Sequence, residues 1–199
     1  VIIMRKILII NANPDPESFN KAIADTYLES ARISGAEVKA IHLGEMNFNP
    51  NLKFGYRKRT NLEPDLLEAI ELIKWSEHIV WIYPIWWIGY PAILKGFIDR
   101  TFLPNIFFLV GETYATTGEL VGLLKGRSSH IITTADTTEK VYIEDFSNTS
   151  IIQLKITLSV CGITDIKNTF FGPVIASTED DRKKWLEEIA EIAKDEATC

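Results

Sequence analysis

The sequence has little histidine, methionine or cysteine, and it lacks an excess of positive charge. Its 199 residues include three histidines, two methionines and two cysteines, and 27 acidic residues outnumber 21 lysines and arginines. The net charge of −6 leaves no overall positive field that could exchange counterions with a phosphate backbone. Nucleic acid is therefore not an expected partner. A hydrophobic content of 46% is enough to build a buried core.

The few histidines and cysteines follow no pattern typical of a metal centre. His42, His78 and His130 are far apart along the chain, whereas the ligands of structural metal sites recur at short intervals. Cys161 and Cys199 form neither a metal motif nor a redox motif, and they allow at most one disulfide. We expect no metal site, and this use of cysteine favours a cytoplasmic protein.

Long hydrophobic runs are also missing. The longest uncharged run, residues 79–94, has sixteen residues and is interrupted by glycine and proline. A helix needs about 20 apolar residues to cross a bilayer, so we interpret this run as a buried strand followed by a loop. We expect no membrane insertion. The length of the chain favours a single domain, which we place at residues 4–199.

Apolar runs typical of strands alternate with segments of helical period. The expected strands are residues 6–10, 36–43, 78–83, 129–134 and 164–171. The expected helices are residues 20–34, 63–76, 91–102, 146–161 and 179–195. This alternation predicts an α/β fold, a doubly wound five-stranded parallel sheet of strand order 2-1-3-4-5 with helices on both faces. In that order the ligand crevice opens at the carboxyl ends of strands one and three.

The segment after the first expected strand carries polar side chains that suit a phosphate. Asn13, Ser18 and Asn20 lie where the next helix begins, and a helix start offers unpaired N–H groups and a partial positive charge. Such a place binds phosphate. The alternative is that Ser18 only caps the helix. No GxGxxG dinucleotide fingerprint is present.

The segments after the third and fourth strands would form the other walls of the crevice. Trp86 and Trp87 are adjacent in a segment expected to be a loop, where polar residues are usual. A flat aromatic cofactor would explain them by stacking, and burial in the core or in a subunit interface is the alternative. Residues 133–142 form the third loop, which is mostly polar and ends at Tyr142, a candidate hydrogen-bond donor. A tyrosine that is merely on the surface is the alternative there.

The connection at residues 103–125 is long and glycine-rich, and connections of that length are usually functional. It contains the apolar run 107–110, which we expect to be exposed. Exposed apolar patches commonly mark interfaces, and two-fold pairs are the commonest homo-oligomers, so the run predicts a homodimer. The alternative is that this run folds back onto its own sheet.

Together these segments resemble the NAD(P)H:quinone oxidoreductase family, the DT-diaphorase-like branch of the flavodoxin-like fold. Residues 12–14 and 18–20 resemble its phosphate loop, with Asn13 where the family usually has histidine. The most specific match is residues 84–100, and the paired threonines at 133–134 match the start of the third loop. The resemblance extends from residue 6 to the last expected helix.

The resemblance implies an NAD(P)H dehydrogenase (quinone) that transfers hydride from NADPH or NADH, through FMN or FAD, to a quinone-like acceptor. It also implies a homodimer with its active sites at the shared interface. The flavin contacts that it implies are Asn13, Ser18, Phe19 and Asn20 at the phosphate end, and Pro84, Ile85, Trp86, Trp87, Ile88, Thr133, Thr134, Ala135, Asp136 and Tyr142 around the ring. Tyr142 would be the catalytic donor.

The sequence departs from the family pattern in the third loop. Ala135 and Asp136 stand where the family usually has two glycines, and a carboxylate there would oppose the negative charge of a reduced flavin. No histidine follows Tyr142. Two alternatives therefore stay open: a flavin-binding regulatory subunit of a membrane transporter, and a one-electron flavodoxin-type carrier. The basic run 57–59 is expected to be a solvated loop, with contact to a nicotinamide 2′-phosphate as its alternative.

Overall fold

The computed structural model describes residues 4–198, so Cys199 and the expected boundary at residue 199 lie outside the described residues. Strands and helices alternate along the chain. In chain order they are β1 (Lys6–Asn11), α1 (Phe19–Ile33), β2 (Glu37–His42), the 3₁₀ turn η1 (Leu43–Glu45), α2 (Pro64–Trp75), β3 (His78–Pro84), α3 (Ala92–Thr101), β4 (Phe108–Val110), α4 (Tyr114–Thr117), β5 (Leu120–Gly122), β6 (Ser128–Thr134), α5 (Glu139–Phe146), α6 (Thr149–Val160), β7 (Asp165–Phe171) and α7 (Glu179–Thr198).

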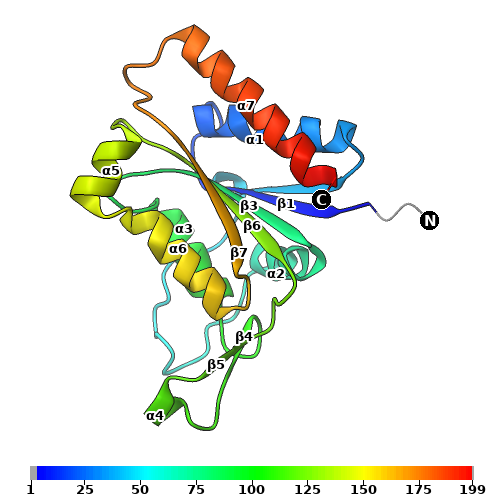
Figure 1. Cartoon of the computed structure of the whole chain (residues 1–199). Helices are drawn as coiled ribbons and strands as arrows, with labels where there is room; N and C mark the ends of the chain where they lie inside the picture. The colour runs from blue at the N-terminus through cyan, green and yellow to red at the C-terminus, as the bar shows by residue number, and fades with distance from the viewer. Residues whose placement is uncertain (1–3, 199) are drawn as a thin grey trace.

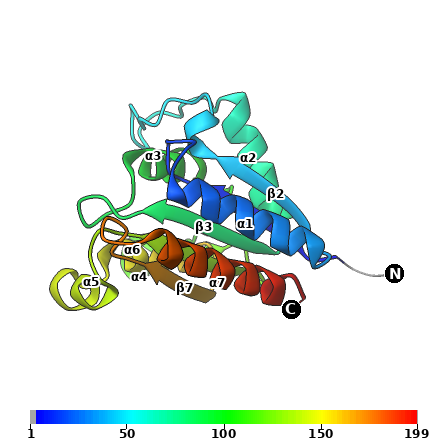
Figure 2. The same ribbon diagram turned by 90° about the horizontal axis from the view of Figure 1, so that it is seen from above.

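Five parallel strands form one twisted sheet in the order β2-β1-β3-β6-β7, and helices cover both of its faces (Figure 1). Helices α1 and α7 lie side by side on one face, as Figure 2 shows from above, while α2, α3 and α6 cover the other. Each face has its own hydrophobic cluster. All seven residues of β3 are buried, as expected for a central parallel strand that is covered on both sides.

The five expected strands occupy the expected places, but the predicted numbering 2-1-3-4-5 is wrong. The connection at residues 103–125 forms two further strands, β4 and β5, which pair antiparallel in a separate two-stranded sheet. The main sheet therefore has the order 2-1-3-6-7. A hairpin forms because the apolar segments on either side of α4 can pair with each other. Gly122 lets it approach the end of α6, since a Cβ at this position would overlap the backbone of Cys161.

The apolar run in this connection is only partly exposed, contrary to expectation. Phe107 is fully buried, and its ring packs edge-on against Phe102 with 4.8 Å between the ring centroids. Leu109 and Val110 stay exposed on the hairpin. The run therefore folds back onto its own subunit at one end and offers apolar surface at the other.

The segment around Tyr142 also differs from the sequence prediction. Residues 133–142 were expected to form a loop and residues 146–161 one helix, but α5 and α6 are separate helices. Thr138 begins α5, because its side chain accepts a hydrogen bond from the amide of Val141. Ser147 and Asn148, which separate the two helices, both have positive φ angles of 55° and 51°.

The histidines are not all far apart in space. His78 and His130 both contact the carboxylate of Glu196 near the amino end of the sheet, at 3.1 and 2.9 Å. Between residues 4 and 198 no group of three or more histidine, cysteine, aspartate or glutamate side chains is arranged to hold a metal ion. No helix in the same part of the chain is long and apolar enough to span a bilayer.

Candidate functional site

The start of α1 forms the first wall of a crevice at the carboxyl ends of β1, β3 and β6. Ser18 is the N-cap of this helix, and its hydroxyl oxygen accepts from the amide of Lys21 at 3.2 Å. The capping role that the sequence left open is thus observed. The amides of Phe19 and Asn20 have no acceptor inside the helix, because the first-turn N–H groups of any helix lack one. The helix start therefore presents donors and partial positive charge to the crevice.

A buried asparagine leaves one donor unused beside these amides. The side chain of Asn20 is 2% exposed, and its oxygen accepts from Asn13 Nδ2 at 3.0 Å and from Thr134 Oγ1 at 3.2 Å. Its Nδ2 has no hydrogen-bond partner among the described residues. Buried polar groups are nearly always paired, so this donor indicates a position for a ligand acceptor.

The aromatic segment after β3 forms a tight two-residue turn. The backbones of Trp86 and Gly89 exchange hydrogen bonds of 2.9 and 3.0 Å. Trp87 and Ile88 between them have φ angles of +49° and +67°. Positive φ at both central residues is typical of a type I′ turn, which favours asparagine and glycine and strains a β-branched residue. Trp87 is 99% exposed, so the turn holds an indole in solvent at a conformational cost.

The third wall is the start of the loop after β6. The Ala135 amide donates to the Phe171 carbonyl at 3.0 Å, and the Ala135 carbonyl accepts from Val174 at 2.8 Å. One carboxylate oxygen of Asp136 accepts from the amide of Ile175 at 2.9 Å. The carboxylate that was expected to oppose a reduced flavin is thus hydrogen-bonded to the connection between β7 and α7.

The structure brings most of the expected site residues together around a crevice of about 200 Å³. The expected residues that line it are Asn13, Phe19, Asn20, Pro84, Ile85, Trp86, Thr134, Ala135 and Asp136. Ser18, Trp87, Ile88, Thr133 and Tyr142 do not line it. Val174 does, and the sequence analysis missed it. Its position just after the last strand, at the same edge of the sheet, could have predicted it as a lining residue.

Tyr142 contacts the turn at Ile88 and does not line the crevice. It is neither on a loop nor on the surface, as it belongs to α5 and is only 1% exposed. Its hydroxyl donates to the carbonyl of Ile88 at 3.0 Å, lies 2.8 Å from Ser150 Oγ and accepts from the Ser150 amide at 2.9 Å. Its ring stacks on Phe170, with 5.8 Å between centroids. In this structure Tyr142 therefore holds the strained turn at Ile88.

A family model described as "Flavodoxin-like fold" matches residues 5–193. The chain belongs to this family. A flavodoxin-like fold places ligands at the carboxyl end of its parallel sheet, where the crevice lies. The family match thus agrees with the sheet order and with the position of the orphaned Asn20 donor.

The relatives of this flavodoxin-like protein include named oxidoreductases. It is 31% identical, over 199 residues, to the uncharacterized NAD(P)H oxidoreductase of Haemophilus influenzae, covering 96% of each chain. It is 26% identical to the ribosyldihydronicotinamide dehydrogenase (quinone) of Rattus norvegicus, covering 96% of this chain and 94% of the rat protein. The resemblance to the NAD(P)H:quinone oxidoreductases is confirmed at the level of the family.

Among solved structures, Smu.1420 from Streptococcus mutans is 31% identical, with a TM-score of 0.77 over 96% of this chain and 99% of that chain. The FMN-dependent NADH-azoreductase of Bacillus anthracis, solved with FMN, is 24% identical with a TM-score of 0.75, over 98% and 100% of the two chains. At that identity the azoreductase supports the fold alone.

Proposed function

We propose that this protein is a flavin-dependent oxidoreductase that transfers hydride from NADPH or NADH to a quinone-like acceptor. The observation that carries the proposal is the crevice, where a helix start, a buried unpaired donor and an aromatic turn meet at one edge of the sheet. The names of the relatives support it, because they describe an NAD(P)H oxidoreductase and a quinone-dependent dehydrogenase.

The residues of the crevice fit a flavin. The amides of Phe19 and Asn20 would hold its phosphate at the start of α1, where a negative charge is favoured. The Ser18 hydroxyl, which caps this helix beside the crevice, would be a further donor. Asn20 Nδ2 would donate to one of its polar atoms, since this donor is otherwise buried without a partner. Backbone groups of Ile85 and Trp86 would lie along the ring system. A bound flavin would supply the hydride chemistry, while the protein supplies position and exclusion of water.

The surrounding contacts support a positioning role for two residues of the proposed site. Tyr142 would fix the turn through the Ile88 carbonyl, so that the Trp86 indole keeps its place in the crevice. The hydrogen bond of Asp136 to Ile175 directs its charge toward the connection before α7. In this structure the Tyr142 hydroxyl is already hydrogen-bonded to Ile88 and Ser150. Direct donation by Tyr142 to a flavin or acceptor oxygen stays a prediction.

We further propose a homodimer of single-domain subunits, residues 4–199, with the second subunit completing each site. The crevice of about 200 Å³ is smaller than the 300 Å³ or more that is typical of ligand pockets. Trp87 extends from its rim into solvent, and Leu109, Val110 and Tyr114 are also exposed. A partner covering these side chains would both bury them and deepen the crevice. The cytoplasmic location stays a prediction.

Flavin binding tests the proposal most directly. We expect the purified protein to bind FMN or FAD at one flavin per chain, and the holoprotein to oxidise NADPH or NADH with menadione. Ser18→Asp should weaken flavin binding on the order of tenfold or more, because it places a charge against the phosphate. Ser18→Asn is the matched control, since asparagine and aspartate cap helices equally well but only aspartate is charged.

Titration by flavin absorbance and a NAD(P)H oxidation assay give the two readouts. Micromolar flavin that changes neither absorbance nor melting temperature would disprove the proposed cofactor. Flavin binding without oxidation of either nucleotide by any quinone would leave the regulatory subunit or the one-electron carrier as the function.

A further inference from the structure

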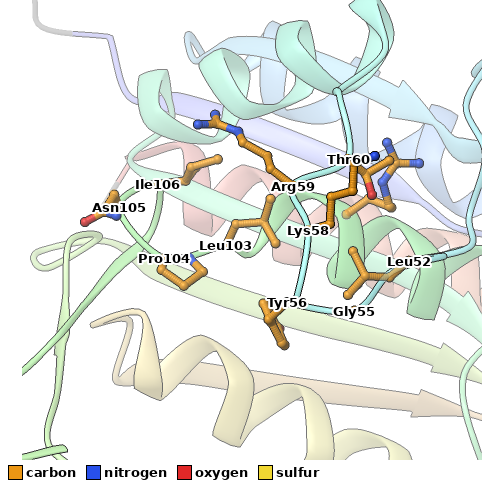
Figure 3. Close-up of a pocket in the computed structure, with 11 residues that line it drawn as sticks. Leu52, Gly55, Tyr56, Lys58, Arg59, Thr60, Leu103, Pro104, Asn105 and Ile106 are labelled. Carbon is orange, nitrogen blue, oxygen red and sulfur yellow. The ribbon is translucent and has the colours of Figure 1, made fainter.

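A second cavity lies beside α3, away from the crevice. It has a volume of about 330 Å³ and shares no lining residue with the crevice. Figure 3 shows its two sides, the loop at residues 56–60 and the segment at residues 103–106 that follows α3. We call it the basic cavity, and the proposed flavin chemistry gives it no role.

The loop that forms one side is strongly basic, although the chain as a whole is acidic. Lys53, Arg57, Lys58 and Arg59 lie within residues 53–59, which contain no acidic residue. Among residues 4–198 none of these four cations forms an ion pair, whereas many other lysines of the surface do. Uncompensated positive charge concentrated at a cavity attracts an anion.

Two of these cations, Lys58 and Arg59, line the cavity together with Arg100. Arg100 differs from them because it is buried and already paired. Its guanidinium bonds to the carboxylate of Glu63 at 2.7 Å and to the carbonyls of Asn49 and Asn61. Its charge is therefore compensated. Lys58 lies over the Phe54 ring, with 5.1 Å from Nζ to the ring centroid, but among the described residues neither Lys58 nor Arg59 has a carboxylate partner, so both are left to meet an anion.

The contacts of Arg100 also fix the two ends of the loop. The two carbonyls that it binds, those of Asn49 and Asn61, belong to the two ends of the excursion at residues 49–61. Pro50 packs so closely on Gly96 of α3 that a Cβ at that glycine would overlap it. The loop ends are thus fixed on α3, which limits the conformational freedom of the basic segment between them.

A hydroxyl group without a partner lies at the same cavity. The Oγ1 atom of Thr60 is buried, and among the described residues it has no hydrogen-bond partner. Thr60 lines the cavity directly after Lys58 and Arg59 in the chain (Figure 3). Buried hydroxyls are usually satisfied, so this one indicates an acceptor that the chain itself does not supply.

The rest of the lining is apolar and aromatic. Leu52, Leu103, Pro104 and Ile106 form the wall, and Tyr56, which is 73% exposed, lies at one end of it (Figure 3). In the same view the Arg59 side chain extends toward Ile106. A ligand for this lining needs a flat apolar body beside its anionic group, since aromatic rings stack on one another and on guanidinium groups.

We propose that the basic cavity binds a phosphorylated aromatic molecule of nucleotide size. Its phosphate lies between Lys58 and the Thr60 hydroxyl, and its ring lies against the apolar wall, Tyr56 and the Arg59 guanidinium (Figure 3). Phosphate suits the Lys58 ammonium group and the Thr60 hydroxyl because it offers several acceptor oxygens. A free mononucleotide and the adenosine 2′-phosphate end of a dinucleotide share this chemistry. The inference does not depend on the proposed function.

The test measures binding of adenosine 2′,5′-bisphosphate to the flavin-saturated protein by calorimetry, with adenosine and inorganic phosphate as comparison ligands. Lys58→Glu with Arg59→Glu should weaken binding of the bisphosphate on the order of tenfold or more. Lys53→Glu with Arg57→Glu is the matched control. It makes the same change of charge in the same loop, at two residues that do not line the cavity.

Thr60→Val gives a second, independent readout. Removing an unpartnered buried hydroxyl should raise the melting temperature of the free protein. The same change should weaken binding of the bisphosphate by about threefold to tenfold. A residue with only a structural role would not move the two quantities in opposite directions. A lower melting temperature with unchanged binding would overturn the role of Thr60.

The remaining outcomes are equally distinct. No binding of the bisphosphate, or equal loss in the two double variants, overturns the site. Competition by NADPH supports the site and identifies its ligand as the outer end of a dinucleotide, whereas binding without competition supports a free nucleotide. A holoprotein that oxidises NADPH with menadione yet binds no bisphosphate would refute the basic cavity alone.

Discussion

The two ends of the same parallel sheet differ in how their buried polar groups are paired. At the amino end, the Glu196 carboxylate contacts His78, His130 and the hydroxyl of Tyr27, the last at 2.7 Å. At the carboxyl end, the Nδ2 atom of Asn20 is left without a partner among the described residues. The strained turn with its exposed tryptophan is also at the carboxyl end.

This difference separates the part of the molecule that stabilises the fold from the part that is suited to a ligand. The amino-end cluster joins α7 to β3 and β6, and its polar groups are satisfied by one another. The carboxyl end keeps an unused donor, positive backbone dihedrals and an indole in water. Strain and unsatisfied groups persist where the surroundings enforce them, and they are typical of functional sites.

The largest effect should come from removing the amino-end carboxylate. Glu196→Ala leaves His78, His130 and Tyr27 without their shared acceptor inside the protein, and it should lower the free energy of unfolding by about 3 kcal/mol. Urea denaturation measures this loss. Glu191→Ala, in an exposed ion pair with Lys194 on the same helix, should change stability by less than about 0.5 kcal/mol.

In Glu196→Ala protein that remains folded, flavin affinity should be unchanged, because the crevice is at the other end of the sheet. Weakened flavin binding in this variant, at a temperature where it is fully folded, would break the separation between the two ends.

The same cluster should make stability depend on pH. Burial lowers the pKa of His78 from 6.5, with the Glu196 hydrogen bond opposing it. Burial by itself raises the pKa of Glu196. Hydrogen bonds from His130 and His78 outweigh burial and hold this pKa well below 4.5. Both contributions to stability are complete above the unfolded pKa values and are lost as the pH falls through the folded ones.

We therefore expect stability to decline as the pH falls below 6.5 and to decline further below 4.5. The slope should reach about 1.4 kcal/mol per pH unit for each proton that the unfolded chain binds in excess. Denaturation between about pH 8 and about pH 2, at intervals of about one unit, measures it. In Glu196→Gln the decline below 4.5 should be shallower. An identical slope in that variant would show that other carboxylates carry the effect.

The smallest effect should come from relaxing the carboxyl-end turn. Replacing Trp87 by asparagine and Ile88 by glycine gives the pair that a type I′ turn favours, so stability should rise by about 1 kcal/mol. Flavin affinity or turnover should fall, because the turn loses its indole and its rigidity. Trp87→Asn alone separates these two causes. A double variant that is less stable than the parent would show that the turn is not strained.

The sequence predicts this crevice well because the rule that locates it is topological. Once the five strands are recognised, the segments after strands one, three and four must meet at one edge, which is where Asn13, Asn20, Trp86 and Thr134 are found. The apolar continuity of β3 is local information that needs no knowledge of tertiary contacts. The same rule, applied to the last strand, would have included Val174.

The features that the sequence did not predict depend on contacts between distant residues. His130 and Glu196 meet only because β6 and α7 pack together, and nothing in the spacing of 66 residues indicates it. Phe107 is buried because the hairpin folds back under Phe102. Tyr142 differs from these residues, because the local sequence contains the signals for its helix: Thr138 can cap it, and a helical period follows. The polarity of this segment led instead to the prediction of a loop.

The place of β7 at the edge of the sheet has a consequence for self-association. An edge strand presents unpaired backbone groups that could template another chain, and proteins block such edges with charged side chains. Asp165 and Lys167 are exposed on the outer strand β7, and the Lys167 side chain is 64% exposed. They discourage the sheet from growing sideways into a continuous intermolecular sheet. The homodimer that we propose would therefore form away from this edge, through the loops around Trp87 and the hairpin.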